Sequence, residues 1–282
     1  MNLGHLVDGL PEAEVRGNRG IDIGSIQLDS RRVGSGDMFV CLEGLARNGH
    51  DFAATAVSQG ASALLVQRYL PELSGTPQVV VPDSREAMAR LAAAFFSYPA
   101  RSLTLVGVTG TNGKTTVTHL VEAVVEAAGK RVEVLGTLGS RVEGGYRPTG
   151  FTTPEAPDLQ RLLRNAADRG TEWVAMEVSS HALAQRRTFA TDFKAVVFTN
   201  LTRDHLDYHG DMESYLEAKS RLFTAEGRGT AGEPVAVINL DEPAGRTLAS
   251  RVSGRRTTYG LSHGAEYRGR RIRSHPEGTT YE

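Results

Sequence analysis

One segment constrains the fold more than any other: an apolar strand-like run, a glycine turn and a helical pattern follow one another directly. The run covers residues 103–108, the turn spans Gly110 to Gly113, and the helical pattern begins at Thr115. In such a unit, backbone N–H groups point into the turn, and the helix dipole adds partial positive charge. Lys114 can then reach the outer phosphates of a nucleotide, and the Thr115 hydroxyl can hold Mg²⁺. The segment therefore predicts an ATP-binding site.

The glycine turn is shorter than the common eight-residue phosphate-binding loop. That loop has a glycine five positions before Gly113, where this chain has Val108. The alternative interpretation is a glycine-rich hairpin or helix cap with a surface lysine, and the flanking strand and helix argue against it. The residues predicted to bind ATP are Gly110, Thr111, Asn112, Gly113, Lys114, Thr115 and Thr116.

Length and composition are those of an ordinary globular protein. The 282 residues suffice for about two domains, and 40% of them are hydrophobic and 23% charged. A net charge of −1 without basic clusters argues against nucleic-acid or membrane-surface partners. No apolar run approaches the roughly 18 residues of a membrane span, and the N-terminus lacks the pattern of a signal peptide. Because Cys41 is the single cysteine, no internal disulfide can form, and we expect a cytoplasmic protein.

The succession of apolar segments predicts an α/β fold with a domain boundary near residue 100. From residue 103 onward, strands alternate with helices, which is typical of a mostly parallel sheet. In residues 1–100 we expect strands at 24–29, 37–42, 63–66 and 79–81 and helices at 52–60 and 84–98. In residues 101–282 we expect strands at 103–108, 131–135, 173–178, 194–199, 235–239, 256–259 and 271–273 and helices at 115–128, 157–168 and 212–224.

Polar side chains follow two of these strands, at the edge where an α/β sheet presents its functional groups. Glu177 ends the strand at 173–178 and can complete a magnesium shell opposite Thr115, since Mg²⁺ needs few protein ligands. By itself, Glu177 is more simply a strand-end carboxylate that faces water, and the phosphate loop favours the metal interpretation. The second strand is followed by a dense polar set: Asn200, Arg203, Asp204, His205, Asp207 and His209.

That second set suits metal or phosphate handling, and a solvated polar loop is the alternative. We favour His205 as a ligand of a second Mg²⁺. In the predicted helix 212–224, Lys219 is three or four positions from apolar residues such as Tyr215 and Phe223, so it shares their face. Spacing alone favours a lysine that extends its head group to solvent. A buried lysine would have a lowered pKa, and its neutral amine can react with CO₂ to give a carbamate that binds metal.

A loop between these elements carries two adjacent threonines, Thr152 and Thr153, before Pro154. Proline makes such a loop rigid, and the two hydroxyls suit hydrogen bonding to a polar substrate. A Thr-Thr-Pro entry to a helix is an equally common use of these residues.

Five motifs, in order and in register, resemble the Mur ligases of peptidoglycan synthesis, and most of all those that add the third residue to the UDP-N-acetylmuramoyl dipeptide. They are Gly-Thr-Asn-Gly-Lys-Thr-Thr, Thr-Thr-Pro, Glu-Val-Ser-Ser-His-Ala-Leu, Asn-Leu-Thr-Arg-Asp-His-Leu-Asp-Tyr-His-Gly and the lysine of Tyr-Leu-Glu-Ala-Lys. The segment from Leu28 to Phe52 resembles the uridine-nucleotide-binding domain of the same family.

The resemblance implies a role for each matching residue. Residues 1–100 would be the domain that binds the UDP-muramoyl peptide, and residues 101–282 an incomplete ATP-binding domain. Lys114, His205 and Lys219 would be catalytic, and Lys219 would be carbamylated. The Mg²⁺ ligands would be Thr115, Glu177, His205 and Lys219. The substrate would contact Leu28, Ser30, Thr152, Thr153, Ser179, Gln185 and Arg187, with residues 44–47 as a nearby loop.

The implied activity is ATP-dependent formation of an amide bond through an acyl phosphate. The amino acid added is expected to be meso-diaminopimelate, with L-lysine as the other choice. The protein is expected to be a monomer that binds only small molecules. The family has a third domain, which selects this amino acid, so we expect this chain to bind substrate and to ligate little. The alternatives are a folylpolyglutamate-type ligase, a sibling Mur ligase that adds D-alanyl-D-alanine, and a non-catalytic module that binds a uridine nucleotide.

Overall fold

The computed structural model describes residues 1–44, 47–142, 145–228 and 232–282. They divide into two compact units: unit 1 comprises Met1–Pro99 and Glu155–Arg164, and unit 2 comprises Ala100–Pro154 and Asn165–Glu282. In this part of the chain, no helix is both long and apolar enough to cross a membrane. The α/β class and the mostly parallel sheet that the sequence predicts are confirmed.

Among the described residues of unit 1, five strands form one sheet in the order β1-β5-β4-β3-β2, and only β1 is antiparallel to its neighbour. The strands are β1 (Glu14–Arg16), β2 (Ser25–Gln27), β3 (Asp37–Val40), β4 (Ala63–Val66) and β5 (Gln78–Val80). The α-helices before residue 100 are α1 (Leu3–Val7), α2 (Ala53–Ser58) and α3 (Ser84–Phe95), and residues 156–164 add part of a further helix to this unit. Alanines of α2 pack on Phe39 and Leu64. Asp83 caps α3, as expected, by accepting hydrogen bonds from the N–H groups of Arg85 and Glu86.

Nine strands form the sheet in the described part of unit 2, in the order β14-β13-β12-β11-β6-β10-β7-β8-β9. The parallel strands are β6 (Thr104–Thr109), β7 (Val132–Gly136), β10 (Trp173–Glu177), β11 (Ala195–Phe198), β12 (Val235–Asn239), β13 (Arg256–Gly260) and β14 (Tyr267–Arg268). The strands β8 (Gly139–Val142) and β9 (Gly145–Arg147) extend the sheet as an antiparallel hairpin.

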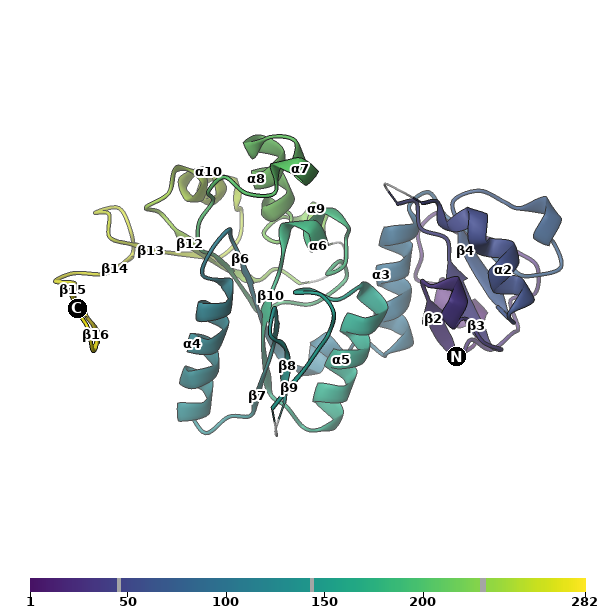
Figure 1. Cartoon of the computed structure of the whole chain (residues 1–282), viewed down its shortest axis with the longest axis horizontal. Helices are drawn as coiled ribbons and strands as arrows, with labels where there is room; N and C mark the ends of the chain where they lie inside the picture. The colour runs from purple at the N-terminus through teal and green to yellow at the C-terminus, as the bar shows by residue number, and fades with distance from the viewer. Residues whose placement is uncertain (45–46, 143–144, 229–231) are drawn as a thin grey trace. The chain divides into compact units, whose positions relative to one another are not determined.

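The helices after residue 100 are α4 (Lys114–Ala127), α5 (Ala156–Asp168), α6 (Ser180–Ala184), α7 (Leu206–His209), α8 (Met212–Ser220), α9 (Ala225–Arg228) and α10 (Pro243–Arg251). The first of these, α4, lies along β6, β10 and β7 (Figure 1). Its Val117 and Val121 pack on Val106 and Val108 of the central strand. Because β6 lies between β10 and β11, the polar segments that follow all three strands meet at one edge of the sheet.

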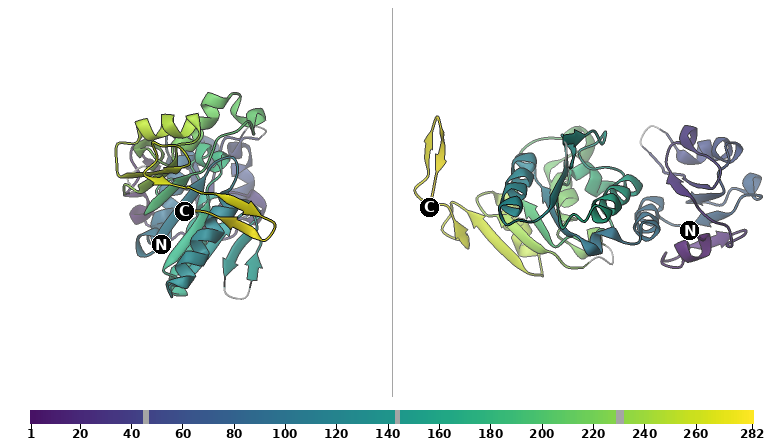
Figure 2. Two further views of the ribbon diagram at one scale, coloured as in Figure 1. Left: turned by 90° about the vertical axis from the view of Figure 1, so that its left-hand side faces the viewer. Right: turned by 90° about the horizontal axis from the view of Figure 1, so that it is seen from below.

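Besides the helix expected at 84–98, which ends at Phe95, two predicted elements differ clearly from the structure. The helix expected at 212–224 ends at Ser220, and Leu222 and Phe223 are buried in turns after it. The strand expected at 271–273 is displaced: β15 (Arg273–His275) pairs with β16 (Gly278–Thr280), and this hairpin lies beyond the edge strand β14 (Figure 2). Both errors fall where the run of apolar residues is short or is interrupted by arginine or glycine. In such segments the apolar periodicity gives little information about where an element begins or ends.

Candidate active site

The glycine loop connects β6 to α4, and its two glycines adopt backbone conformations with positive φ. Gly110 has φ +148° and Gly113 has φ +85°. A β-carbon at Gly110 would collide with the Thr199 hydroxyl, whereas a β-carbon at Gly113 would meet no atom within 4 Å. The N-cap residue of α4 is Gly113, which has no side chain to cap the helix. The N–H groups of its first turn therefore have no side-chain acceptor among the described residues, as an anion site requires.

The segment that follows β11 holds this loop in shape. The N–H groups of Thr111 and Asn112 donate to the backbone and side-chain oxygens of Asn200, at 3.0 and 2.8 Å. The Thr111 hydroxyl accepts from the Thr202 N–H at 2.9 Å. Thr199 donates its hydroxyl to the Asn112 carbonyl at 2.7 Å. The sequence prediction assigned Asn200 to metal or phosphate handling, and in the structure its side chain supports the loop.

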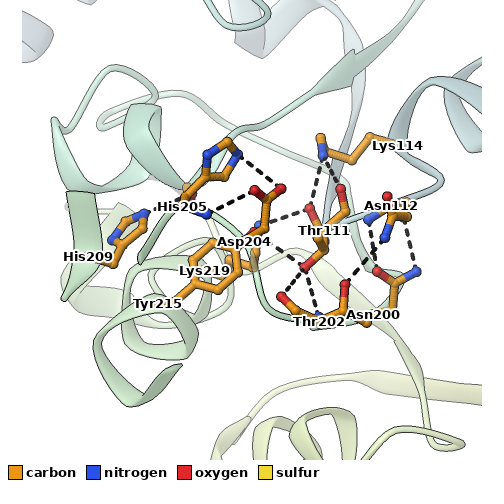
Figure 3. A network of polar contacts seen from close by, with 12 residues as sticks. Thr111, Asn112, Lys114, Asn200, Thr202, Asp204, His205, His209, Tyr215 and Lys219 are labelled. Carbon is orange, nitrogen blue, oxygen red and sulfur yellow. Dashed lines mark hydrogen bonds and ion pairs between the residues drawn. The ribbon is translucent and has the colours of Figure 1, made fainter. Parts of the chain in front are cut away.

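Lys114 bends back over the loop (Figure 3). Its ammonium donates to the carbonyl oxygens of Gly110 at 3.0 Å and Thr111 at 2.9 Å. Burial lowers the pKa of Lys114, and the carboxylates of Glu177 and Asp204 oppose this shift. The ammonium therefore rests on carbonyl oxygens of the loop itself, and a phosphate group bound by the loop could attract it.

Lys219 is buried, with 1% of its surface exposed, so the solvent-reaching alternative is wrong and the buried one is confirmed. Its ammonium donates to the Gly110 carbonyl at 2.9 Å and lies 4.5 Å from the centre of the Tyr215 ring (Figure 3). Burial lowers the pKa of Lys219 to about 7, and the positive charge of Lys114 adds to the shift. Two lysines thus share one carbonyl oxygen of the phosphate loop, and near neutral pH one of them is substantially neutral.

Glu177 is also buried and receives hydrogen bonds from two elements. Its Oε1 accepts from the Thr115 hydroxyl and from the Thr137 N–H, both at 2.9 Å. Its Oε2 accepts from the Thr137 hydroxyl at 3.2 Å. Among the described residues, no cationic side chain forms an ion pair with this carboxylate. Oxygen donors from a carboxylate and a hydroxyl are the ligands that Mg²⁺ prefers, so Thr115 and Glu177 fit a magnesium site.

His205 lies in a different environment. Its backbone has φ +51°, and its Nε2 is 3.4 Å from the Asp204 carboxylate. The centres of its ring and of the His181 ring are 4.8 Å apart. Burial lowers the pKa of His181 and lowers that of His209 to about 4. Among the described residues, no group of three or more His, Cys, Asp or Glu side chains gathers as a metal site. The structure therefore brings Thr115 and Glu177 together but does not bring His205 into contact with them.

Five of the predicted substrate residues lie near the carboxyl end of β10: Thr152, Thr153, Ser179, Gln185 and Arg187. The Thr153 hydroxyl donates to the Glu177 carbonyl at 2.9 Å and accepts from the Ser179 N–H at 3.0 Å. Arg187 donates to the Thr153 carbonyl at 2.8 Å and to the Gln185 side chain at 2.6 Å.

The fifth of these residues, Thr152, lies 3.2 Å from Thr137, hydroxyl to hydroxyl. The remaining two predicted substrate residues are in unit 1. Ser30 is buried there, and Leu28 lines a cavity of about 410 Å³. The nearby loop 44–47 includes residues 45 and 46, which lie outside the described residues.

Sequence reasoning missed Thr137 altogether. It follows the end of β7, and a polar residue after a parallel strand of this sheet was the available signal. A cavity of about 830 Å³, lined by Val132 and Glu133, lies at the other end of β7 and is not part of this site.

Together, the fold and the site define the chain as an α/β protein with a phosphate loop at the tip of a central parallel strand. The model of the Mur ligase middle domain matches residues 108–282, and the Mur ligase family catalytic domain matches residues 22–96. The chain therefore belongs to the Mur ligase family.

Two curated relatives are both UDP-N-acetylmuramoyl-L-alanyl-D-glutamate–2,6-diaminopimelate ligases. The one from Geobacillus thermodenitrificans is 43% identical over all of this chain and 58% of its own length. The one from Geobacter metallireducens is 47% identical over 93% of this chain and 52% of its own length. The chain thus spans about half the length of these relatives.

Two solved structures share the fold of this chain. A UDP-N-acetylmuramoyl-L-alanyl-D-glutamate–2,6-diaminopimelate ligase superposes with a TM-score of 0.78 at 32% identity, covering 92% of this chain and 53% of that one. A folylpolyglutamate synthase from Mycobacterium tuberculosis, complexed with ADP and AMPPCP, has a TM-score of 0.55 at 18% identity over 70% of this chain and 51% of that one. The second likeness is one of fold alone.

Proposed function

We propose that this chain forms the uridine-nucleotide-binding and ATP-binding parts of an ATP-dependent ligase. The ligase would add meso-diaminopimelate to UDP-N-acetylmuramoyl-L-alanyl-D-glutamate in peptidoglycan biosynthesis. The names of the relatives, at 43 and 47% identity, support this choice of amino acid over L-lysine. The family match over residues 22–96 supports it over a folylpolyglutamate-type ligase. We also propose that the protein acts as a cytoplasmic monomer on small molecules.

The observation that carries the proposal is the burial of Lys219 against the phosphate loop. A protein that only binds ATP needs Lys114 but has no use for a second, neutral amine on the Gly110 carbonyl. A neutral amine adds CO₂ to form an N–C bond and loses one proton, which gives a carbamate anion. That anion would place oxygen ligands beside the phosphate loop, where Thr115 and Glu177 already supply oxygen donors. Carbamylated Lys219 is therefore part of the proposed function.

The chemistry follows from the charges involved. An oxygen of the D-glutamyl carboxylate attacks the γ-phosphorus of ATP, and the bond to ADP breaks to leave an acyl phosphate. The amine of the incoming amino acid then attacks the acyl carbon, loses a proton, and displaces phosphate as the amide forms. Mg²⁺, when bound, neutralises phosphate charge. Lys114 and the N–H groups of the loop would hold the phosphates, so the protein acts mainly by positioning and charge stabilisation.

Residues 1–100, with Leu28 and Ser30, would bind the uridine diphosphate. Residues 101–282 would bind ATP and the muramoyl peptide. The contacts to that peptide would come from Thr152, Thr153, Ser179, Gln185 and Arg187, with His205 as a further metal ligand.

Calorimetric titration of the chain tests this proposal. We expect Mg²⁺ with the ATP analogue AMPPCP to bind, and UDP-N-acetylmuramoyl dipeptide to bind more tightly than UDP. Lys114→Met should abolish analogue binding, whereas Lys130→Met, which changes an exposed lysine paired with Glu172, should not. Binding of the dipeptide without the analogue would instead indicate a non-catalytic uridine-nucleotide module. Failure of both ligands to bind would contradict the proposed function.

A further inference from the structure

Thr137 contacts both Glu177 and Thr152, and the roles proposed above for the site residues do not explain these contacts. It follows Gly136, the last residue of β7, and its own surface is exposed. A β-carbon at Gly136 would collide with the Glu177 carboxylate, so glycine lets this strand end approach closely. Thr137 then holds both carboxylate oxygens: its N–H donates to Oε1 at 2.9 Å and its hydroxyl to Oε2 at 3.2 Å. Both rotation and tilt of the carboxylate are thereby restricted.

The hydroxyl groups next to Glu177 also have a fixed direction of donation. A carboxylate can only accept hydrogen bonds, and a threonine hydroxyl has a single proton to donate. Thr137 gives that proton to Glu177, so in its 3.2 Å contact with Thr152 it must be the acceptor. The proton of the Thr152 hydroxyl is consequently engaged by Thr137. Thr152 is left with oxygen lone pairs to offer to a ligand.

We propose that Thr137 is a positioning residue that orients Glu177 for a divalent cation and makes Thr152 a hydrogen-bond acceptor for the substrate. This inference rests on the proposed function. The chemical group that Thr152 recognises is therefore a donor, an N–H or O–H of the muramoyl peptide, and not one of its carboxylates. One side chain in this way links the cation-binding groups to the peptide-binding loop.

The test uses matched variants of the whole chain. Thr137→Val keeps the shape and the backbone N–H but removes the hydroxyl, and Thr137→Ser restores the hydroxyl. Thr247→Val is the control, because Thr247 is exposed on α10 and its hydroxyl donates to the Pro243 carbonyl of its own helix. The affinity of the AMPPCP-bound chain for Mn²⁺ is measured by electron paramagnetic resonance. Affinity for the UDP-muramoyl dipeptide is measured by calorimetry, and folding by the melting temperature.

We expect Thr137→Val to weaken Mn²⁺ binding about 10- to 100-fold, as loss of a residue that orients a metal ligand does. It should also weaken dipeptide binding, because the Thr152 hydroxyl then loses the partner that fixes its direction. Thr137→Ser should recover both affinities, and Thr152→Val should affect the dipeptide but not Mn²⁺. Because Glu177 keeps the Thr115 hydroxyl and the Thr137 N–H as donors, Thr137→Val should lower the melting temperature only slightly, and Thr137→Ser should restore it.

The outcomes separate the two proposals. If the wild-type chain binds Mn²⁺ with AMPPCP and Thr137→Val binds it equally well, the role of Thr137 is wrong and the proposed function stands. A Thr137→Ser variant as weak as Thr137→Val would also overturn that role. If the wild-type chain binds neither the analogue nor the dipeptide, both proposals are wrong.

Discussion

At the scale of single residues, the two loop glycines have different reasons to be glycine. Both have positive φ, where a side chain costs about 1–2 kcal/mol. Only Gly110 also lies against another residue, Thr199. We therefore expect Gly110→Ala to lower the free energy of unfolding clearly more than Gly113→Ala, which should cost about 1–2 kcal/mol. Urea unfolding without nucleotide measures both, and equal losses would show that the Thr199 contact is unimportant.

Lys219 gives a prediction for pH dependence. Its pKa is about 7 in the folded chain, below the ordinary value of 10.5 expected after unfolding. Between these pH values the unfolded state holds a proton that the folded state has lost. The free energy of unfolding therefore rises with pH, by up to about 1.4 kcal/mol per pH unit from this group. Below pH 7 both states are protonated, and the contribution becomes constant.

Lys219→Met should remove this slope in CO₂-free buffer, and Lys130→Met should keep it. Chemical unfolding at several pH values between 6 and 10 provides the measurement. Parallel curves for the wild type and Lys219→Met would contradict the burial of a neutral amine.

The identity of the phosphate-loop residues could be predicted from sequence because the whole loop is a contiguous segment. The environment of Lys219 could not, because its neighbour Gly110 is 109 residues away in the chain. Its position on the apolar face allowed both a buried and a solvent-reaching side chain. Thr137 was missed for the same reason, since its partner Glu177 is 40 residues away.

At the scale of elements, the apolar strands were predictable and the hairpin β8–β9 was not. Buried runs such as Val196–Phe198 lie inside a parallel sheet, so hydrophobicity alone indicates them. The hairpin is rich in glycine and arginine, and a polar network attaches it to α4. Arg141 of β8 donates to buried Glu122 at 2.6 Å, and Glu122 also contacts His119 at 2.8 Å. Such a contact between side chains 19 residues apart leaves no periodic signal.

Loss of Arg141 should leave Glu122 buried with one partner fewer. We expect Arg141→Met to lower the free energy of unfolding by about 1–3 kcal/mol and to speed hydrogen exchange in β8 and β9. Arg147→Met is the control, since Arg147 is exposed on β9 of the same hairpin. Equal effects of the two variants would mean that the Glu122 network does not hold the hairpin.

At the scale of the whole molecule, the chain contains a phosphate loop, a buried lysine and the residues that we propose to bind substrate, yet spans about half the length of its relatives. We therefore expect the chain to bind the nucleotide but to release ADP more slowly than a full-length relative does. A coupled assay for ADP, with dipeptide and diaminopimelate present, measures this. Normal turnover by the 282-residue chain would contradict this expectation.

The central claim is that the glycine turn after β6 holds a nucleoside triphosphate beside Glu177. A crystal structure of the chain with Mg²⁺ and AMPPCP tests it most directly. The account predicts that the Lys114 ammonium leaves the Gly110 and Thr111 carbonyls for the phosphates, with Thr115 and Glu177 next to the cation. An analogue bound elsewhere, with Lys114 still on those carbonyls, would contradict the account.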